Sequence, residues 1–372
     1  MKLYNYHFNK AIWVYLDESD FYFRLGRFWY TPFADRFNYL NQFSNFDFLT
    51  FEDKLPTENR KLSYRELCLN RARELMNEYP DGIAVSVSGG VDSAGIVCSF
   101  LHEGIEPSKL RIICNEVIES EFPHFLDFLI AKGCKIQYLK DMNSYLSIYD
   151  NLPEKVILFG WCNDQLFHHV SCYKNLKNSL EGWTIGLYNL YKQYGIDIDR
   201  YYESDLDKIY NYSKLLNWDI ERYYDVCTML NFGIHYDVVR HYFQESTLNT
   251  DTRKKVKQFF DTQDFQDWGF TFRHENKDAF VKCANGNNQF YKRELKEIIY
   301  DVTKDENYLK NKGKEPSWGK TQKAHKSELP FIVGVRDLTG YHVSVLDPYY
   351  INHKDMHYCN SISDLLLKDY KK

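Results

Sequence analysis

The sequence predicts an α/β fold: a parallel sheet with helices on both faces, followed by a mostly helical region and a C-terminal β-hairpin. Between residues 64 and 161, short apolar segments of strand length alternate with longer segments of helical periodicity. Such alternation is typical of parallel sheets, because neighbouring parallel strands are joined by helical crossovers. The stretch "LPFIVGVRDLTGYHVSVLDPYY" near the end of the chain favours two strands around a short turn.

The first predicted elements lie before residue 105. A small β-rich cap is expected over residues 1–60, where aromatic residues are frequent and alternate as in strands. Ser63 is a typical N-cap for the helix "YRELCLNRARELMNEY", and the Pro-Asp-Gly sequence at residues 80–82 ends that helix. "IAVSV" then predicts a buried strand, and "SAGIVCSFLHEG" predicts an apolar-faced helix that Gly104 stops.

The later elements continue the same alternation. Strands are predicted at residues 110–114, 135–139 and 155–161, and a helix is predicted at 121–133. From about residue 165 to 315 the clearer segments are helices at 204–216, 238–245 and 291–302, and the final hairpin turns at 338–340. We therefore expect three parts: the cap at 1–60, an α/β domain at 61–325 and a hairpin extension at 326–372.

The composition limits the classes of function. The nine cysteines include no CxxC pair and no short His/Cys cluster, so neither a zinc site nor a disulfide framework is indicated. Unpaired cysteines suit a reducing compartment, and a cytoplasmic location is expected. No apolar run is long enough to span a bilayer, and we recognise no secretory signal. The net charge of −5 gives no electrostatic reason to expect a nucleic-acid partner.

The string "AVSVSGGVDSAG" carries the strongest functional signal, because an apolar strand runs through two glycines directly into a helix. Gly89 and Gly90 remove side chains where a ligand could approach the backbone, and they permit positive φ. The unpaired amides of such a loop and of the helix start attract an anion, and Ser88 and Ser93 add hydroxyl donors. Asp92 would repel a bare phosphate, which indicates a bound cation such as Mg²⁺. The string therefore predicts a phosphate site.

A structural alternative is a tight Gly-Gly turn after which Asp92 and Ser93 only cap the helix. The full string, in its strand-loop-helix context, favours the phosphate interpretation. The loop matches neither G-x-x-x-x-G-K-[ST] nor G-x-G-x-x-G, which are the two common phosphate-binding patterns.

The segment "SGGVDS" resembles the pyrophosphate-binding loop of the N-type ATP pyrophosphatases, also called the PP-loop superfamily. This superfamily includes asparagine synthetases, GMP synthetases, NAD synthetases and tRNA-thiolating enzymes. The resemblance implies an adenine nucleotide alpha hydrolase-like fold, and it implies cleavage of ATP to AMP and pyrophosphate. Such enzymes adenylate a carboxylate or carbonyl oxygen, and a nucleophile then displaces AMP.

The segment "FGWCNDQLFHH", residues 159–169, resembles the part of asparagine synthetases that has a Gly, an acidic Ser-Asp-Glu core and a following Phe. The matching positions are Gly160, Asn163, Asp164, Leu166 and Phe167. By this resemblance, Gly160 belongs to the nucleotide site and Asp164 is the second Mg²⁺ ligand beside Asp92. Mg²⁺ between two carboxylates and pyrophosphate would neutralise the leaving group. The structural alternative is a strand end followed by a capped helix.

The segment "YKRELKEIIYDVTKDENYLKNKGKEPSWGK", residues 291–320, resembles the late synthetase region, where a basic, Gly-containing loop follows a helix. By this resemblance, Lys314 stabilises pyrophosphate as it leaves, and Lys292 matches another basic position. Charge at such a lysine matters most in the transition state. The alternative is a solvated lysine-rich loop, and Lys310 and Lys312 are close enough to shift the register.

The chain also departs from the asparagine synthetase pattern. Trp161 stands where the family has its catalytic glutamate, Gln165 replaces the Glu of the Ser-Asp-Glu core, and "NFGIHYDVV" lacks the charged pair of a third family segment. Because tryptophan cannot take up a proton at neutral pH, any base must come from elsewhere. His168, His169 and His235 are candidates by their proximity in sequence, with structural roles as the alternative. These departures leave two interpretations open: an altered substrate or nucleophile, or lost activity.

The leading hypothesis is an ATP-dependent, Mg²⁺-dependent ligase that adenylates a small-molecule carboxylate and forms an amide. We expect no glutaminase domain, because the catalytic cysteine that follows the initiator methionine in amidotransferase-type relatives is absent from "MKLYNYHF". The nitrogen would come from ammonia, from a small amine or from an amine-delivering partner, and a homo-oligomer also stays open. Two alternatives remain: a PP-loop enzyme that modifies a nucleobase or nucleic acid, for which only Cys162 is a suggestive thiol, and a non-catalytic nucleotide-binding protein.

Overall fold

The computed structural model of the 372-residue chain describes residues 36, 39, 56, 57, 61–139, 149, 151–167, 181–236, 254–275, 292–312, 331–337 and 340–346. The chain divides into two compact units. The sheet unit comprises Pro56–Phe167 and Thr247–His325, and the second unit comprises Met1–Leu55, His168–Ser246 and Lys326–Lys372. The predicted division at residues 60 and 325 stays a prediction, and the predicted cap lies almost wholly outside the described residues.

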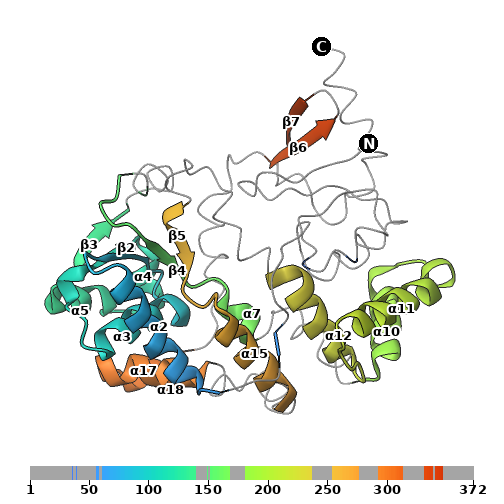
Figure 1. The fold of residues 1–372 in the computed structure, drawn as a ribbon, viewed down its shortest axis with the longest axis horizontal. Helices are drawn as coiled ribbons and strands as arrows, with labels where there is room; N and C mark the ends of the chain where they lie inside the picture. The colour runs from blue at the N-terminus through green and yellow to red at the C-terminus, as the bar shows by residue number, and fades with distance from the viewer. Residues whose placement is uncertain are drawn as a thin grey trace. The chain divides into compact units, whose positions relative to one another are not determined.

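A five-stranded parallel sheet forms the centre of the sheet unit, in the order β3-β2-β1-β4-β5 (Figure 1). Its strands are β1 (Ile83–Ser86), β2 (Leu110–Cys114), β3 (Lys135–Tyr138), β4 (Ile157–Phe159) and β5 (Val256–Gln258). Val85 of the central strand pairs in parallel with Ile112 of β2 and with Leu158 of β4, and all three side chains are fully buried. An apolar strand with neighbours on both sides is typical of a parallel sheet. The predicted α/β class is confirmed, while the coverage of both faces by helices stays a prediction.

The sequence does not mark β5, which lies in the region expected to be mostly helical. This strand has only three residues, Val-Lys-Gln, so neither an apolar run nor an alternation of strand length identifies it. It forms because it pairs with β4, with Val256 opposite Ile157 and Gln258 opposite Phe159. Between β5 and residue 312 the described elements are helices, as predicted: α15 (Gln263–Glu275), α17 (Arg293–Thr303) and α18 (Glu306–Asn311).

The strand order reverses between β1 and β4. From β1 the chain moves outward through β2 to β3, and it then returns to the other side of β1 to form β4 and β5. In open parallel sheets, ligands bind outside the carboxyl ends of the two strands where the order reverses. Those two ends lead here into residues 87–93 and residues 160–167, which are the segments that the sequence motifs select.

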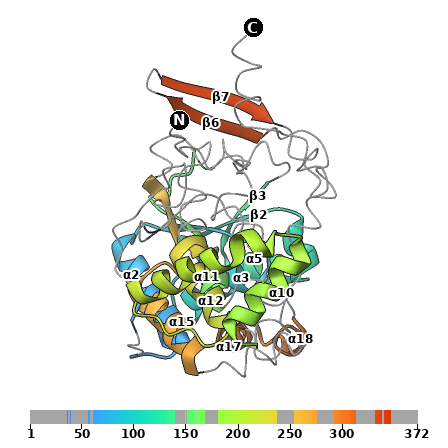
Figure 2. The same cartoon turned by 90° about the vertical axis from the view of Figure 1, so that its right-hand side faces the viewer.

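Three helices of the sheet unit pack together: α2 (Tyr64–Glu78), α3 (Val91–His102) and α17 (Figure 2). Ser63 caps α2 as predicted, because its hydroxyl accepts from the amide of Glu66 while the Glu66 carboxylate accepts from the amide of Ser63. Gly95 lets α3 and α17 approach closely, since a Cβ at this position would lie 2.3 Å from Cδ1 of Leu295. The shorter helices are η2 (Pro107–Lys109), α4 (Val117–Glu121), α5 (Phe125–Lys132) and α7 (Asn163–Phe167).

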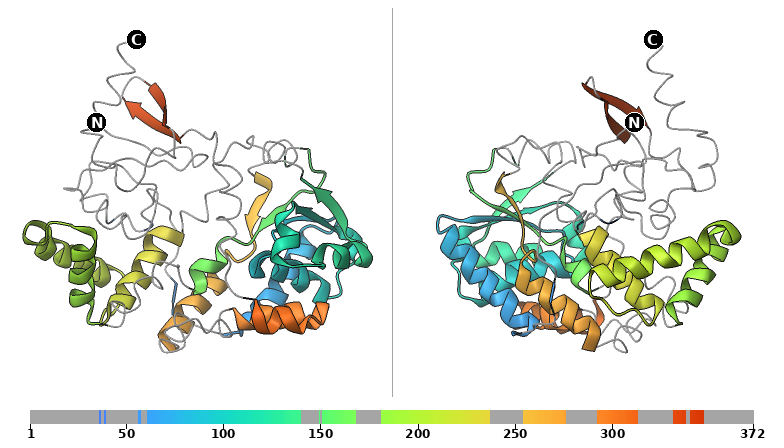
Figure 3. Two further views of the ribbon diagram at one scale, coloured as in Figure 1. Left: turned by 180° about the vertical axis from the view of Figure 1, so that it is seen from behind. Right: turned by 45° about the vertical axis from the view of Figure 1, so that its right-hand side comes forward.

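In the second unit, helices dominate residues 181–236, as expected. They are α10 (Trp183–Tyr194), α11 (Ile198–Leu215), α12 (Tyr223–Leu230) and the π-helical turn η3 (Asn231–His235). The predicted hairpin is confirmed by β6 (Phe331–Asp337) and β7 (Gly340–Leu346), which pair antiparallel (Figure 3). The predicted helix at 238–245 lies outside the described residues. Every described helix is too short or too polar to cross a lipid bilayer.

Candidate functional site

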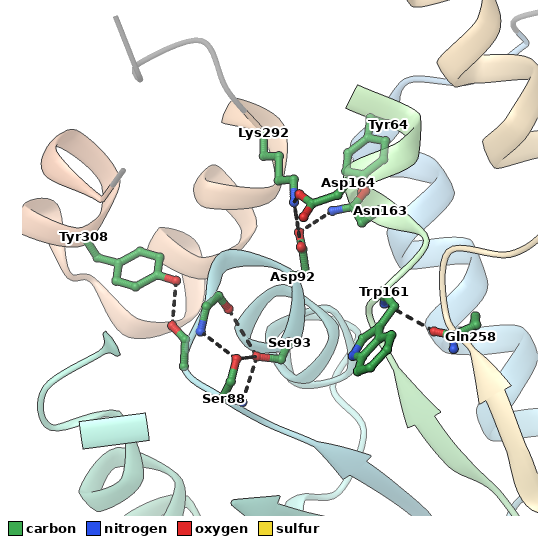
Figure 4. A network of polar contacts seen from close by, with 12 residues as sticks. Tyr64, Ser88, Asp92, Ser93, Trp161, Asn163, Asp164, Gln258, Lys292 and Tyr308 are labelled. Atoms are coloured by element: carbon green, nitrogen blue, oxygen red, sulfur yellow. Dashed lines mark hydrogen bonds and ion pairs between the residues drawn. The ribbon is translucent and has the colours of Figure 1, made fainter. Parts of the chain in front are cut away.

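The loop between β1 and α3 folds around its own serines (Figure 4). Ser93 Oγ accepts a hydrogen bond from the amide of Ser88 at 3.1 Å, and Ser88 Oγ accepts one from the amide of Gly90 at 3.3 Å. Gly89 has a φ of 84°, and a Cβ there would lie 2.9 Å from the carbonyl oxygen of Ile118. Glycine is therefore required at residue 89, whereas Gly90 has an ordinary φ of −66°.

The start of α3 presents free backbone donors. Gly90 is the N-cap, and no side chain caps the helix. Among the described residues, the amides of Val91, Asp92 and Ser93 have no hydrogen-bond acceptor. Unpaired amides and the helix dipole together attract an anion such as phosphate. The local geometry of the loop is thus compatible with the predicted phosphate site.

The segment after β4 lies against the start of α3. A Cβ at Gly160 would lie 3.1 Å from Cβ of Asp92, so this glycine allows the two segments to approach closely. Helix α7 begins three residues later and carries Asp164 in its first turn. The amide of Trp161 donates to Oε1 of Gln258 at 3.2 Å, which joins this segment to the end of β5. The two predicted carboxylates therefore come from the segments that follow the carboxyl ends of the neighbouring strands β1 and β4.

Lys292 contacts both predicted carboxylates (Figure 4). Its Nζ lies 2.5 and 2.6 Å from the two carboxylate oxygens of Asp92 and 2.6 Å from Oδ1 of Asp164. The Lys292 side chain is only 2% exposed, whereas the side chains of Asp92 and Asp164 are 25% and 31% exposed. One ammonium group between two carboxylates leaves a net negative charge, and the exposed parts of the carboxylates can accept a further cation.

Lys292 is held in an unusual backbone conformation. It precedes α17 with φ 51° and ψ 37°, the left-handed region that costs an ordinary residue about 1 kcal/mol or more. Burial alone would lower the pKa of Lys292, but the carboxylates of Asp164 and Asp92 raise that pKa above its ordinary value overall. The amine is therefore protonated at neutral pH, and its contacts with the two aspartates are ion pairs.

Asp92 and Asp164 fit a site for a divalent cation, because both carboxylates already converge on one positive charge. Mg²⁺ prefers oxygen ligands, and proteins commonly bind it through one or two carboxylates, with phosphate oxygens and water as the other ligands. In the described part of the chain, no group of three His, Cys, Asp or Glu side chains could hold a metal. Water and phosphate oxygens can supply the remaining ligands of a cation bound to these two carboxylates.

Two buried residues of the site have no predicted role. Asn163 Nδ2 donates to Oδ1 of Asp92 at 2.6 Å, and Asn163 Oδ1 accepts from the hydroxyl of Tyr64. Both side chains belong to fully buried residues. Asn163 adjoins Asp164, so the motif placed it near the site. Tyr64 is 99 positions from Asn163, and no local signal in the sequence indicates the contact.

A second polar cluster lies behind the loop. The Tyr308 hydroxyl donates to the carbonyl oxygen of Gly89 at 3.1 Å. Lys312 Nζ lies 2.6 Å from Oε2 and 2.7 Å from the carbonyl oxygen of Glu121, and the side chains of Lys312 and Glu121 are only 7% and 2% exposed. Lys296 Nζ donates to the carbonyl oxygen of Lys312 at 2.7 Å. These contacts attach the segment after α17 to the back of the loop.

The contacts described above bring together the following predicted residues of the sheet unit: Ser88, Gly89, Gly90, Asp92, Ser93, Gly160, Asp164 and Lys292. Other predicted residues lie outside the described part of the chain: Lys314, His168, His169 and the side chain of His235. Of the two lysines near Lys314, Lys312 is buried as described above, and Lys310 is exposed and pairs with Glu306 at 2.6 Å. Cys162 is fully buried, and Gln165 is also buried.

Comparison of the chain with protein-family models and with curated proteins finds no match. The functional argument therefore rests on the site itself. Its parts are the amides at the start of α3, two carboxylates and a buried lysine, and they lie where the strand order of the sheet reverses.

Proposed function

We propose that this chain is an ATP-dependent, AMP-forming carbon–nitrogen ligase of the PP-loop superfamily, similar to the synthetase domain of asparagine synthetases. A carboxylate oxygen of a small-molecule substrate attacks the α-phosphorus of ATP, and the bond from that phosphorus to the bridging oxygen breaks. Pyrophosphate leaves with the bond electrons. Ammonia or an amine then attacks the acyl carbon, and the bond from that carbon to the AMP oxygen breaks. AMP leaves with the bond electrons, and the nitrogen loses a proton as the amide forms.

The observation that carries this proposal is the contact of Lys292 with both Asp92 and Asp164, next to the glycine loop. A structural turn would explain the glycines, but it would not explain two carboxylates and a buried ammonium group at the same sheet edge. The strand order β3-β2-β1-β4-β5 and the position of the loop after the central strand are compatible with an adenine nucleotide alpha hydrolase-like fold. Ligands bind at such a point of strand-order reversal.

Each group has a defined part in the proposed reaction. The amides of Val91, Asp92 and Ser93 and the hydroxyls of Ser88 and Ser93 would bind phosphate oxygens. Asp92 and Asp164 would hold Mg²⁺, which supplies positive charge to the departing pyrophosphate when it is bound. Lys292 adds a fixed positive charge beside the same oxygens, and Lys314 is proposed to stabilise the leaving pyrophosphate.

The acceptor chemistry differs from that of aspartate-to-asparagine conversion. Trp161 stands at the position of the family's catalytic glutamate, and its amide is bound to Gln258 at 3.2 Å. Gln165 is buried and carries no charge. Neither side chain can remove a proton from an attacking amine. We therefore propose a nucleophile that arrives deprotonated, or a substrate that supplies its own base.

Product analysis tests the proposal. The protein is incubated with Mg-ATP, alone and with pools of carboxylates, amino acids, amines and ammonia, and nucleotide products are separated by chromatography. We expect AMP and pyrophosphate only with a particular pool. We expect Asp92→Asn or Asp164→Asn to lower AMP formation about 100-fold or more. Asp81→Asn is the matched control, because Asp81 is exposed and pairs with exposed Lys155, and it should keep full activity.

Other outcomes would contradict the ligase assignment. Production of ADP instead of AMP, or unchanged AMP formation by Asp92→Asn, would exclude the proposed site. ATP binding without turnover in any pool would favour a non-catalytic nucleotide-binding protein. AMP release that requires added nucleic acid would favour a nucleobase-modifying enzyme, although the only suggestive thiol, Cys162, is fully buried. A reactive thiol needs exposure and a lowered pKa.

A further inference from the structure

A chain of two hydrogen bonds reaches Asp92 from the side opposite to solvent. The Tyr64 hydroxyl donates to Oδ1 of Asn163, and Nδ2 of Asn163 donates to Oδ1 of Asp92 at 2.6 Å (Figure 4). The three residues come from three helices, α2, α7 and α3, and they are far apart in the sequence. Neither Tyr64 nor Asn163 has exposed surface, so neither contact is exchanged with water.

The amide of Asn163 faces Asp92 with its NH₂ end and Tyr64 with its oxygen. An amide has one acceptor end and one donor end, and only the donor end can contact a carboxylate without repulsion. Tyr64 donates to the acceptor end, so the orientation that Asp92 requires leaves neither end of the buried amide without a partner. Burial raises the pKa of Tyr64 well above its ordinary value, so the phenol keeps the proton that it donates.

Aromatic packing fixes the tyrosine itself. The ring of Tyr64 lies 4.7 Å from that of Trp268 and 5.0 Å from that of Phe167, measured between ring centroids. These contacts hold the ring of Tyr64 within the buried core. The side chains of Tyr64 and Asn163 thus connect the carboxylate of Asp92 to the core of the sheet unit.

We propose that Tyr64 and Asn163 are positioning residues that orient Asp92 for binding of a metal–nucleotide complex. This inference rests on the proposed function for the identity of the ligand. Groups that orient a metal ligand commonly contribute 10- to 100-fold to metal affinity. Lys292 also contacts Asp92, but its ammonium group donates to both carboxylate oxygens and can do so from many directions. The amide of Asn163 donates to Oδ1 alone and therefore restricts the orientation of the carboxylate more closely.

The test measures binding of Mn²⁺ together with α,β-methylene-ATP, a nucleotide that cannot be cleaved between its α and β phosphates. Free Mn²⁺ is followed by electron paramagnetic resonance. We expect Tyr64→Phe, which removes only the hydroxyl, to weaken binding about 3- to 10-fold, and Asn163→Leu to weaken it about 10- to 100-fold. The control is Tyr191→Phe, since Tyr191 is also a buried tyrosine that donates to a carboxylate, Oδ2 of Asp205 at 2.5 Å, in the second unit.

A double-mutant comparison separates positioning from a general loss of packing. If Tyr64 acts through Asp92, Tyr64→Phe will weaken binding in the wild-type background and will have little further effect when Asp92 is replaced by asparagine. An equal loss in both backgrounds, no loss in Tyr64→Phe, or the same loss in Tyr191→Phe would overturn the inference. Failure of the wild-type protein to bind Mn²⁺ with the nucleotide would instead overturn the proposed function and this role with it. If Asn163→Leu does not fold, the Tyr64→Phe comparison decides.

Discussion

The ammonium group of Lys292 contacts both carboxylate oxygens of Asp92, at 2.5 and 2.6 Å, although the two residues are 200 positions apart. The same group lies 2.6 Å from Asp164. Lys292 thus supplies the positive charge that two neighbouring carboxylates need when they lie at a largely buried edge of the sheet. A divalent cation that binds here would share these two carboxylates with the lysine.

Removal of this charge is expected to destabilise the protein in a way that metal can reverse. Lys292→Met keeps an unbranched side chain, shorter by one atom, but leaves two carboxylates without a counter-charge. We expect it to lower the free energy of unfolding by about 3 kcal/mol. Added Mg²⁺ or Mn²⁺ should restore part of this loss, because the cation replaces the ammonium group. Urea denaturation with and without metal measures both effects.

Lys304→Met is the control for this experiment. Lys304 also adopts a left-handed conformation, with φ 60°, and it lies exposed at the other end of α17. The substitution should change stability little, with or without metal. If Lys292→Met is as stable as Lys304→Met, the ion pairs of Lys292 contribute nothing to folding.

A methyl group at residue 89 is expected to harm the loop more than backbone strain alone explains. Gly89→Ala must adopt a φ of 84° and places its Cβ 2.9 Å from the carbonyl oxygen of Ile118. Gly104→Ala has a similar φ of 73° but meets no atom within 4 Å. We expect about 1–2 kcal/mol of destabilisation at residue 104 and more at residue 89, with nucleotide binding lost only at residue 89. Equal losses of stability would show that the contact with Ile118 has no effect.

The buried ion pair behind the loop is expected to be structural. Lys312→Met leaves the Glu121 carboxylate buried without its counter-charge and should cost about 3–5 kcal/mol, whereas the double variant with Glu121→Leu should recover much of this loss. Lys310→Met, in an exposed pair, should leave the melting temperature nearly unchanged.

By contrast, Lys314→Ala should lower AMP formation without a change in melting temperature. Loss of AMP formation in Lys310→Met alone would mean that the register of the lysines is shifted.

Two buried thiols predict a loss of stability at alkaline pH. Burial raises the pKa of Cys114, with a smaller contribution from Glu119, and burial raises the pKa of Cys134; both values rise from 9.0 to about 11. At a pH between about 9 and about 11, the native protein keeps thiol protons that the unfolded chain has released. The free energy of unfolding therefore decreases as the pH rises through this range. Denaturation curves should show a smaller decrease for a Cys114→Ala/Cys134→Ala variant than for the wild-type protein. Parallel behaviour of the two proteins over this range would contradict the raised pKa values.

The loop and its two flanking elements could be predicted because their causes are local. The apolar segment, the adjacent glycines and the apolar-faced helix follow one another directly, so the pattern alone determines strand, loop and helix. The capping box of Ser63 and Glu66 is local for the same reason. Asp164 and Lys292 are indicated by the resemblance of their motifs. The strand order places the segment of Asp164 beside the loop, and the packing of α17 against α3 brings Lys292 there.

The remaining parts of the site depend on contacts between distant residues. Strand β5 has too few residues to leave a pattern, and it exists because β4 offers it an edge. The hydroxyl of Tyr64 belongs to a helix whose sequence predicts only an apolar face. Lys312 resembles any lysine of a basic loop until its buried contact with Glu121 is known. Periodicity and motifs record none of these pairings.

The close crossing of α3 and α17 at Gly95 and Leu295 also determines when the site can exist during folding. Lys292 and Asp92 are 200 positions apart, so the chain must close a long loop before they meet, and such long-range contacts form slowly. A partly folded chain that has only β1 and α3 carries the glycine loop without a complete site. A ligand that needs all the charged groups binds only the fully folded sheet unit. Its binding therefore shifts the folding equilibrium toward the native state by mass action.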